Sequence, residues 1–187
     1  MRIVAGRWRG RTLESPAGDT TRPTADRVRQ ALFDMLMHAP WGGRETVEDA
    51  VVLDAFAGSG ALGLESLSRG ARRAVFVEQD AGALASLRAN IRACGAADRA
   101  TVVAADVLAL TRVPRDAPPA DLVFLDPPYA RGLITPALGR LQAVGLVKPD
   151  ALIVAETGRS EPPPVSGCLA ERTHGAARLT IWRSSDT

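Results

Sequence analysis

The chain has 187 residues, of which 46% are hydrophobic and 24% are charged, and its formal net charge is +2. This composition fits one globular domain with a sizeable core, and the two separated cysteines argue against a disulfide framework or a zinc site. Because no stretch reaches the length of a membrane span and the start lacks the apolar run of a signal peptide, we expect a cytoplasmic protein without a membrane partner.

The first 23 residues predict a small basic extension, and we place the main domain at residues 24–187. Short apolar runs at 3–4 and 12–13 flank a turn-rich segment, which predicts a hairpin, and residues 15–23 predict a loop. Seven arginines and three acidic residues lie between residues 1 and 29, so this stretch is more basic than the chain as a whole. Arginine suits forked contacts to phosphate, although a biased genomic base composition would also enrich it.

A helix is predicted to follow Thr24 as its N-cap and to end before Pro40. Its core-facing positions are predicted to be Val28, Ala31, Leu32, Met35 and Leu36. From residue 51 the chain alternates predicted strands (51–53, 74–77, 101–103, 122–125 and 151–155) with predicted helices (61–69, 81–94 and 134–144). Two further runs, 169–173 and 178–182, predict a terminal hairpin.

Strands that are apolar throughout and alternate with helices predict an α/β fold, with a mostly parallel sheet covered by helices on both faces. The terminal hairpin is expected to add antiparallel strands at one edge. In such sheets ligands bind beyond the carboxyl ends of the strands. Residues that directly follow each strand are therefore the candidates for a functional site.

The first candidate follows the strand at 51–53, where Asp54 precedes the spacing Gly58-x-Gly60-x-x-Gly63. Glycines at a strand–helix turn let a ligand approach the backbone closely, but this spacing also suits a dinucleotide or a plain tight turn. Asp54 favours another ligand, because an acid there would repel a pyrophosphate and attract the ammonium or sulfonium of S-adenosylmethionine.

The next two candidates are the acids after the second and third strands. Glu78 lies 20 residues beyond Gly58 and could accept both ribose hydroxyls of a nucleoside, which suits S-adenosylmethionine and nicotinamide cofactors equally. Asp106 could accept a hydrogen bond from an adenine amino group. It could also cap a short segment that starts at Val107, and the two roles are compatible.

The most specific candidate is Asp126-Pro127-Pro128-Tyr129, directly after the strand at 122–125. The prolines fix the backbone and leave carbonyl groups free to accept hydrogen bonds. Asp126 adds a charged acceptor and Tyr129 an aromatic face, and stacking of a base on such a face contributes roughly 1–3 kcal/mol. This combination predicts a site for a flat base that bears an amino group.

These segments together resemble the class I methyltransferases that carry an (Asp/Asn)-Pro-Pro-aromatic motif. Residues 6–11 (GRWRGR), 22–29 (RPTADRVR) and 54–70 resemble more closely the RsmD family of bacterial 16S rRNA guanine-N2 methyltransferases. The Arg-Pro-Thr-x-Asp-Arg-Val-Arg segment discriminates best, and the motif order extends from Arg2 to Trp182. The resemblance implies a Rossmann-like fold with a seven-stranded sheet.

The resemblance also implies the reaction and the partner. A methyl group would pass from S-adenosylmethionine to the exocyclic N2 amine of one guanine in 16S rRNA, without a metal, leaving S-adenosylhomocysteine. The substrate would be an assembled or nearly assembled small ribosomal subunit, and we expect the enzyme to be a monomer. The helix start near Thr24 would lie over the methionine end of the cofactor.

Three sets of site residues are predicted on these grounds. The catalytic set is Asp126, Pro127, Pro128 and Tyr129. The cofactor-binding set is Thr24, Asp54, Phe56, Ala57, Gly58, Gly60, Glu78, Asp106 and Val107. The RNA-binding set is Arg7, Trp8, Arg9, Arg11, Arg22 and Arg27, although Trp8 could instead pack against the N-terminal hairpin.

Three alternatives remain open at the level of sequence. One is a related amino methyltransferase that acts on adenine N6 of DNA or on glutamine N5 of a protein. Another is a nicotinamide-dependent oxidoreductase, which would use Gly58, Gly60, Gly63 and Glu78 but would leave the Asp126–Tyr129 motif unexplained. The last is a nucleic-acid-binding module without catalysis.

Overall fold

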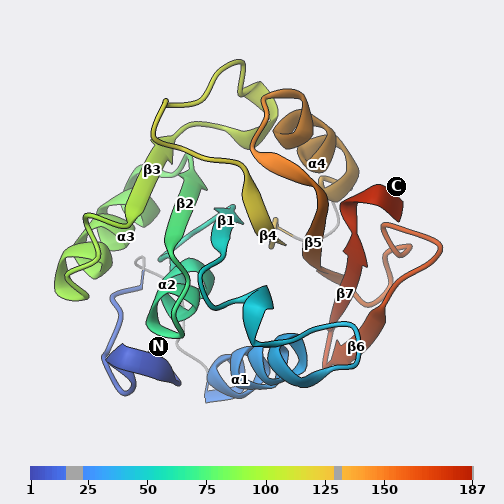
Figure 1. The fold of residues 1–187 in the computed structure, drawn as a ribbon, viewed down its shortest axis with the longest axis horizontal. Helices are drawn as coiled ribbons and strands as arrows, with labels where there is room; N and C mark the ends of the chain where they lie inside the picture. The colour runs from blue at the N-terminus through green and yellow to red at the C-terminus, as the bar shows by residue number, and fades with distance from the viewer. Residues whose placement is uncertain (16–22, 129–131, 187) are drawn as a thin grey trace.

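The computed structural model describes residues 1–15, 23–128 and 132–186, and its centre is a seven-stranded sheet (Figure 1). The strands lie side by side in the order β3-β2-β1-β4-β5-β7-β6. Their bounds are β1 Val51–Ala55, β2 Arg73–Glu78, β3 Ala100–Ala104, β4 Ala120–Leu125, β5 Val147–Gly158, β6 Ala170–His174 and β7 Ala177–Arg183. The helices are α1 Pro23–His38, α2 Ala61–Ser68, α3 Ala81–Ala93 and α4 Ile134–Ala143, with short 3-10 turns η1 Gly6–Trp8 and η3 Val107–Ala109 among the connections.

The predicted topology is confirmed. Strands β1 to β5 pair in parallel, whereas β7 runs antiparallel to β5 and β6 runs antiparallel to β7 at the sheet edge. The β5 strand is longer than the predicted 151–155 at both ends: Val147 pairs with Ala120 of β4 beyond an irregularity, and residues 156–158 pair with β7.

Helices cover both faces of the sheet, as predicted. One hydrophobic cluster joins the N-terminal segment, α1, α2 and α3 to sheet residues such as Phe76 and Phe124. A second cluster joins α4 and η3 to residues of the opposite face, such as Leu53 and Val123. Side chains of β1, β2, β4 and β5 alternate between these clusters, so these four strands are buried on both faces, which explains their continuous apolar runs in the sequence.

Helix α1 differs from its prediction in two respects. It begins at Pro23, so Thr24 lies inside the helix and is not its N-cap, and a proline suits the first turn because it lacks an N–H group. Ala31, predicted to face the core, is exposed, while Phe33 is fully buried with its ring 5.8 Å from that of Phe124. Among the described residues, no helix has both the length and the apolar character needed to cross a membrane.

The N-terminal segment reverses direction as predicted and packs against α2. Its two arms are joined by the Arg2–Thr12 bridge and by an Ile3 amide that donates to the Arg11 carbonyl at 2.9 Å. Ser68, the last residue of α2, donates its hydroxyl to the Ala5 carbonyl at 2.6 Å. A side chain on Gly6 would lie 1.9 Å from the Ser68 carbonyl oxygen, so this contact requires glycine.

A second attachment links the end of this segment to the glycine turn after β1. The Asn90 side chain of α3 is buried, and its amide oxygen accepts a hydrogen bond from the Glu14 N–H at 2.7 Å. Its amide nitrogen donates to the carbonyl groups of Glu14 and Ser59, both at 2.9 Å. One side chain thereby holds the N-terminal segment, α3 and the glycine turn together.

The buried carboxylate of Glu65 makes the third and largest attachment. Its side chain is 0% exposed and accepts hydrogen bonds from the Val4 and Ala5 amides at 2.8 and 3.0 Å. The Arg69 Nε atom donates to it at 2.8 Å, and the Arg29 Nε atom of α1 lies 3.5 Å away. Glu65 thus joins the N-terminal segment, α1 and α2 through a single charge.

We predict that Glu65→Ala lowers the free energy of unfolding by about 3–5 kcal/mol, because the buried Arg69 guanidinium loses its nearest carboxylate and Arg29 keeps only Asp26. Urea denaturation followed by circular dichroism measures the loss. The control is Glu48→Ala, which removes an exposed carboxylate that accepts from Arg44 at 3.1 Å. Its expected effect is below about 1 kcal/mol, and equal effects of the two substitutions would contradict the assigned role of Glu65.

Candidate functional site

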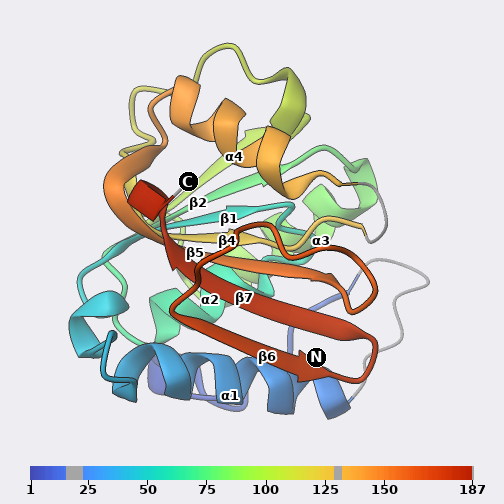
Figure 2. The same cartoon turned by 90° about the vertical axis from the view of Figure 1, so that its right-hand side faces the viewer.

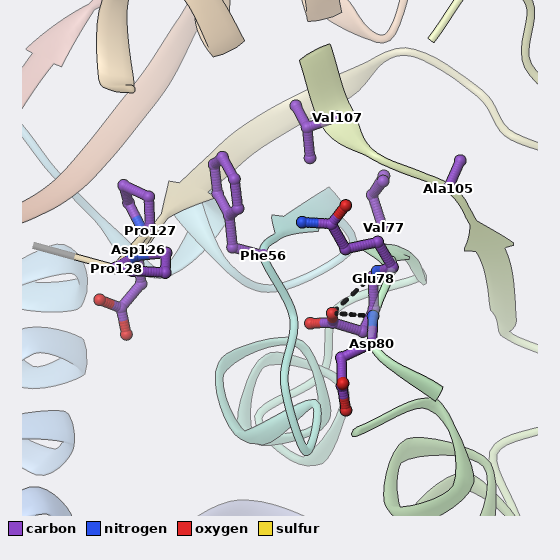
Figure 3. A pocket seen from close by; sticks show the side chains of 10 residues that line it. Phe56, Val77, Glu78, Asp80, Ala105, Val107, Asp126, Pro127 and Pro128 are labelled. Atoms are coloured by element: carbon purple, nitrogen blue, oxygen red, sulfur yellow. Dashed lines mark hydrogen bonds between the residues drawn. The ribbon is translucent and has the colours of Figure 1, made fainter. Parts of the chain in front are cut away.

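The carboxyl ends of the parallel strands open onto two adjoining cavities, of about 510 and 500 Å³. Phe56 and Asp126 line both of them. The first cavity is completed by Val77, Glu78, Gln79, Asp80, Ala105, Val107, Pro127 and Pro128 (Figure 3). The second cavity lies between the glycine turn, α1 and the β6–β7 hairpin, and Asp54, Ala57, Gly58, Arg29, Glu156 and His174 are among its lining residues. The predicted strand-end acids Asp54, Glu78 and Asp126 therefore surround one composite cleft.

The glycine turn after β1 is shaped by close packing. Gly58 and Gly60 have φ values of +54° and +80°, in the left-handed region that favours glycine. A Cβ atom on Gly60 would lie 2.4 Å from Leu87, and one on Gly63 would lie 2.3 Å from the Phe76 ring. Gly60 therefore lets the turn approach α3, and Gly63 lets α2 approach the sheet, whereas a Cβ on Gly58 would meet nothing within 4 Å.

Phe56 occupies a strained position between the two cavities. Its φ of 67° is unusual for a residue with a side chain, and such a conformation costs on the order of 1–3 kcal/mol. Figure 3 shows the ring between the Asp126–Pro128 turn on one side and Glu78 on the other. Strain held at such a place points to a ligand-facing role for the ring.

Glu78 is oriented by the backbone around it. One carboxylate oxygen accepts from the Gly58 amide at 2.7 Å, and the other accepts from the Gln79 and Asp80 amides, both at 2.8 Å. A carboxylate has about four lone-pair positions and these bonds use three of them, so one acceptor position remains, on the oxygen that accepts from Gly58. The carboxylate is thus fixed at the wall of the first cavity, in a position that suits the predicted ribose contact.

Asp54 is the buried acid of the cleft. Its side chain accepts from the Gly63 amide at 2.9 Å, and the residue is only 2% exposed. Burial raises the pKa of Asp54 to about 7, the Gly63 hydrogen bond opposes this rise, and the charge of Glu78 adds to it. A cation in the second cavity would favour the ionised form, which is the electrostatic property expected of a site for an ammonium or sulfonium group.

Asp106 caps the turn after β3. It is the N-cap of η3, and its carboxylate accepts from the Leu108 amide at 2.9 Å. Ala105 and Val107, on either side of it, line the first cavity. The capping role is therefore present in the structure, and the contact with an adenine amino group stays a prediction.

The motif after β4 forms the boundary between the cavities. Asp126 is exposed and faces both cavities, Pro127 is buried, and Pro128 lines the first cavity. Tyr129 and Arg22, two further predicted site residues, lie outside the described residues. The described part of the motif combines a charged acceptor with a rigid backbone at the point where the two cavities meet.

The predicted RNA-binding residues divide into two groups. Arg7, Arg9 and Arg27 are exposed, and Arg11, also exposed, donates to the Ala93 carbonyl at the end of α3. Trp8 is only 7% exposed and belongs to the hydrophobic core. Its ring therefore packs the N-terminal segment, as in the alternative raised from sequence, and we withdraw it from the RNA-binding set.

Among the residues of the second cavity that sequence reasoning missed, three have charged or titratable side chains: Arg29, Glu156 and His174. Arg29 is buried through its ion pairs with Asp26 and Glu65, at 2.9 and 3.5 Å. Glu156 had a usable signal, because it follows the apolar run of its strand just as Asp126 follows the run of β4. His174 comes to the cavity through strand pairing, which sequence did not reveal.

The chain is similar in sequence to one protein family and to methyltransferases of ribosomal RNA. A family model described as Conserved hypothetical protein 95 matches residues 1–183. Ribosomal RNA small subunit methyltransferase D of Haemophilus influenzae is 36% identical over 188 residues, which cover 98% of this chain and 94% of that protein. The Escherichia coli protein of the same name is 41% identical over 157 residues, which cover 84% of this chain and 74% of that protein.

Solved structures agree with the fold. The Escherichia coli protein yhhF has a TM-score of 0.79 at 36% identity, with 100% of this chain and 99% of that chain covered. The 16S rRNA N2-guanine methyltransferase RsmC of T. thermophilus, in complex with AdoMet and guanosine, has a TM-score of 0.64 at 22% identity. That likeness covers 89% of this chain and 44% of RsmC, and it concerns the fold alone. The predicted Rossmann-like methyltransferase fold is confirmed.

The raised pKa of Asp54 predicts that the protein loses stability as the pH rises. Between its ordinary value of 3.8 and about 7, the folded state binds a proton that the unfolded state has released, so unfolding becomes easier across this window. Each unit of pKa difference corresponds to about 1.4 kcal/mol, which makes the total loss a few kcal/mol.

Urea denaturation of the ligand-free protein at pH 5 and pH 8 tests this. The wild-type protein should lose stability between the two pH values, and Asp54→Asn should lose a few kcal/mol less. The matched control is Asp121→Asn, which removes a half-buried carboxylate far from the cleft, beside Lys148. Parallel pH dependence of the wild type and Asp54→Asn would show that Asp54 ionises normally.

Proposed function

This chain belongs to the Conserved hypothetical protein 95 family, as its resemblance to the RsmD family predicted, and from that premise we propose that it methylates the N2 amine of a guanine in 16S rRNA. It is an S-adenosylmethionine-dependent rRNA methyltransferase. The observation that carries the proposal is the position of Asp126 and Pro127, where a cavity suited to a nucleoside meets one that contains a buried acid.

The residues of the cleft fit the cofactor. The Glu78 carboxylate, fixed by three amides, would accept from the ribose through its remaining lone pair, and Phe56 and Val107 would offer apolar walls for the adenine in the first cavity. Asp54 supplies the negative charge that a cationic methionine end requires. When bound, S-adenosylmethionine supplies a methyl carbon activated by its sulfonium.

The acceptor amine needs alignment more than activation by a strong base. The lone pair of a guanine amino group is delocalised into the ring, which makes it a poor nucleophile. Hydrogen bonds from this group to the Asp126 carboxylate and the Pro127 carbonyl would hold the nitrogen in line with the methyl carbon and stabilise the positive charge that develops on it. In the transfer the N–C bond would form as the S–C bond breaks, and Asp126 or water would take the proton that the nitrogen then releases.

We extend the proposal to the state of the substrate. The target base must leave its stack to reach the cleft, and the exposed arginines of the N-terminal segment suit contacts to the phosphates around it. The substrate is proposed to be an assembled or nearly assembled small subunit, met in the cytoplasm by a monomeric enzyme.

Labelled S-adenosylmethionine incubated with small ribosomal subunits that lack the modification tests the proposed function. Free rRNA and duplex DNA serve as alternative substrates, and nucleoside analysis identifies the product. We expect N2-methylguanosine on the subunit. Label on adenine or on protein would show that the enzyme acts on a different substrate. If the protein binds the cofactor but labels none of these substrates, a binding module without catalysis would be favoured.

We predict that Asp126→Ala lowers turnover by at least about 100-fold, because it removes an aligning group whose effect appears in the transition state. Cofactor affinity, measured by calorimetry, should change little, since Asp126 is assigned to the acceptor. Activity that stays within a few-fold of the wild type would exclude the alignment role.

Charge reversal of Arg7 and Arg9 should weaken RNA binding and flatten its salt dependence. Each lost phosphate contact is expected to lower the slope of log K against log salt by about 0.7–0.9. Arg112→Glu with Arg115→Glu is the matched control, because these exposed arginines lie in the loop before β4 and change the net charge equally. Equal slopes for the two double variants would show that the N-terminal arginines only face solvent.

A further inference from the structure

The second cavity contains a carboxylate, Glu156, that the reaction outlined above does not use. Leu125 of β4 pairs with Ala155 of β5, so Asp126 and Glu156 are the next residues along two neighbouring parallel strands. Side chains alternate along a strand, and Val154 and Phe124 both belong to the cluster on the α1 face. Asp126 and Glu156 consequently face the same side of the sheet, and both line the second cavity.

Apolar side chains lie around Glu156 in the second cavity. Glu156 pairs with Leu179 of β7, and Leu179 lines the cavity together with Val154 and Leu32. Helix α1 and strand β6 lie side by side at this edge of the molecule (Figure 2). A flat base that entered from the Asp126 side would have apolar side chains against its faces. Its amino group would lie near Asp126, and Glu156 would lie next to the amino group along the edge of the base.

Guanine has a pattern of donors that matches two neighbouring carboxylates. Its N2 amino group lies beside the N1–H group, so two donors point to the same side. A carboxylate is an acceptor only, and it has no proton to offer when ionised. In adenine and in 2-aminopurine the ring nitrogen next to the amino group is an acceptor, which a carboxylate would repel.

We propose that Glu156 is the residue that specifies guanine, by accepting the N1–H hydrogen bond while Asp126 holds the N2 amine. This inference rests on the proposed function, and it adds a specificity residue to that site. Among the described residues, the cavity is also lined by Asp54, Asp126, Arg29, His174 and Met1, which carries the amino terminus. Arg29 is engaged by Asp26 and Glu65, and His174 lies at the end of β6, near the hairpin tip.

The test compares how the wild type and Glu156→Gln bind two ribonucleosides, guanosine and 2-aminopurine riboside. Glutamine has nearly the same size, but its amide can turn and donate a hydrogen bond to an unprotonated ring nitrogen. Each nucleoside is titrated by NMR into the complex with S-adenosylhomocysteine. The wild type should prefer guanosine by about 10- to 100-fold, the range expected for a hydrogen bond to a charged group, and Glu156→Gln should lose most of this preference.

Glu171→Gln is the matched control. Glu171 is an exposed carboxylate of β6, 4.0 Å from Arg178, and it does not line the cavity. This variant should keep the wild-type preference. Methyl transfer to unmodified small subunits should fall by at least about 10-fold in Glu156→Gln, while the affinity for S-adenosylmethionine stays within a few-fold of the wild type.

The outcomes distinguish a failure of the proposed function from a failure of the role assigned to Glu156. If the wild type forms no N2-methylguanosine, the proposed function is wrong. If the wild type forms it but Glu156→Gln keeps the preference for guanosine, the assignment of Glu156 is overturned. Equal weakening of both nucleosides, as a general loss of structure would cause, would overturn it as well, because the ratio of the two affinities would not change.

Discussion

The architecture around the cleft depends on one buried charge. The Glu65 carboxylate has no exposed surface, and it is tolerable there because two guanidinium groups and two backbone amides surround it. Its partners come from three parts of the chain: the N-terminal segment, α1 and α2. Helix α2 follows the glycine turn, and Arg29 of α1 lines the second cavity. The ion network around Glu65 therefore fixes the distance between the glycine turn and α1, which faces it across the second cavity.

Strain and desolvation are concentrated where the ligands are expected. Phe56 has a left-handed backbone, and Asp54 is buried with its pKa raised to about 7 by that burial. Both features cost free energy, and such costs are concentrated at sites that bind ligands: a bound cation would favour the ionised form of Asp54, and the Phe56 ring would contact a bound base. The packing of Gly60 and Gly63 against Leu87 and Phe76, together with the Asn90 hydrogen bonds, keeps the turn in this conformation.

The sheet could be predicted well from the sequence, because the signal for each strand lies in neighbouring residues. Parallel strands that are buried on both faces give continuous apolar runs, and the rule that ligands gather at their carboxyl ends placed Asp54, Glu78 and Asp126 around one cleft. The failures concern long-range contacts. Burial of Trp8 depends on Ser68 and on Arg99, whose guanidinium lies 5.4 Å from the ring, and Glu65 depends on Val4 and Ala5 about 60 residues away. No spacing within a helix or strand could reveal such partners.

The distribution of charge fits the proposed binding of a cation and a polyanion by one small domain. Acids line the cleft, with Asp54, Asp126 and Glu156 in the second cavity, whereas exposed arginines lie on the N-terminal segment. A phosphate would be repelled from the cleft and attracted to those arginines, while a neutral base could enter without penalty. The same acids attract the cationic cofactor. Negative charge in the cleft and positive charge on the N-terminal segment would therefore favour one arrangement. In it the RNA backbone stays outside the cleft and only an extruded base reaches the methyl group.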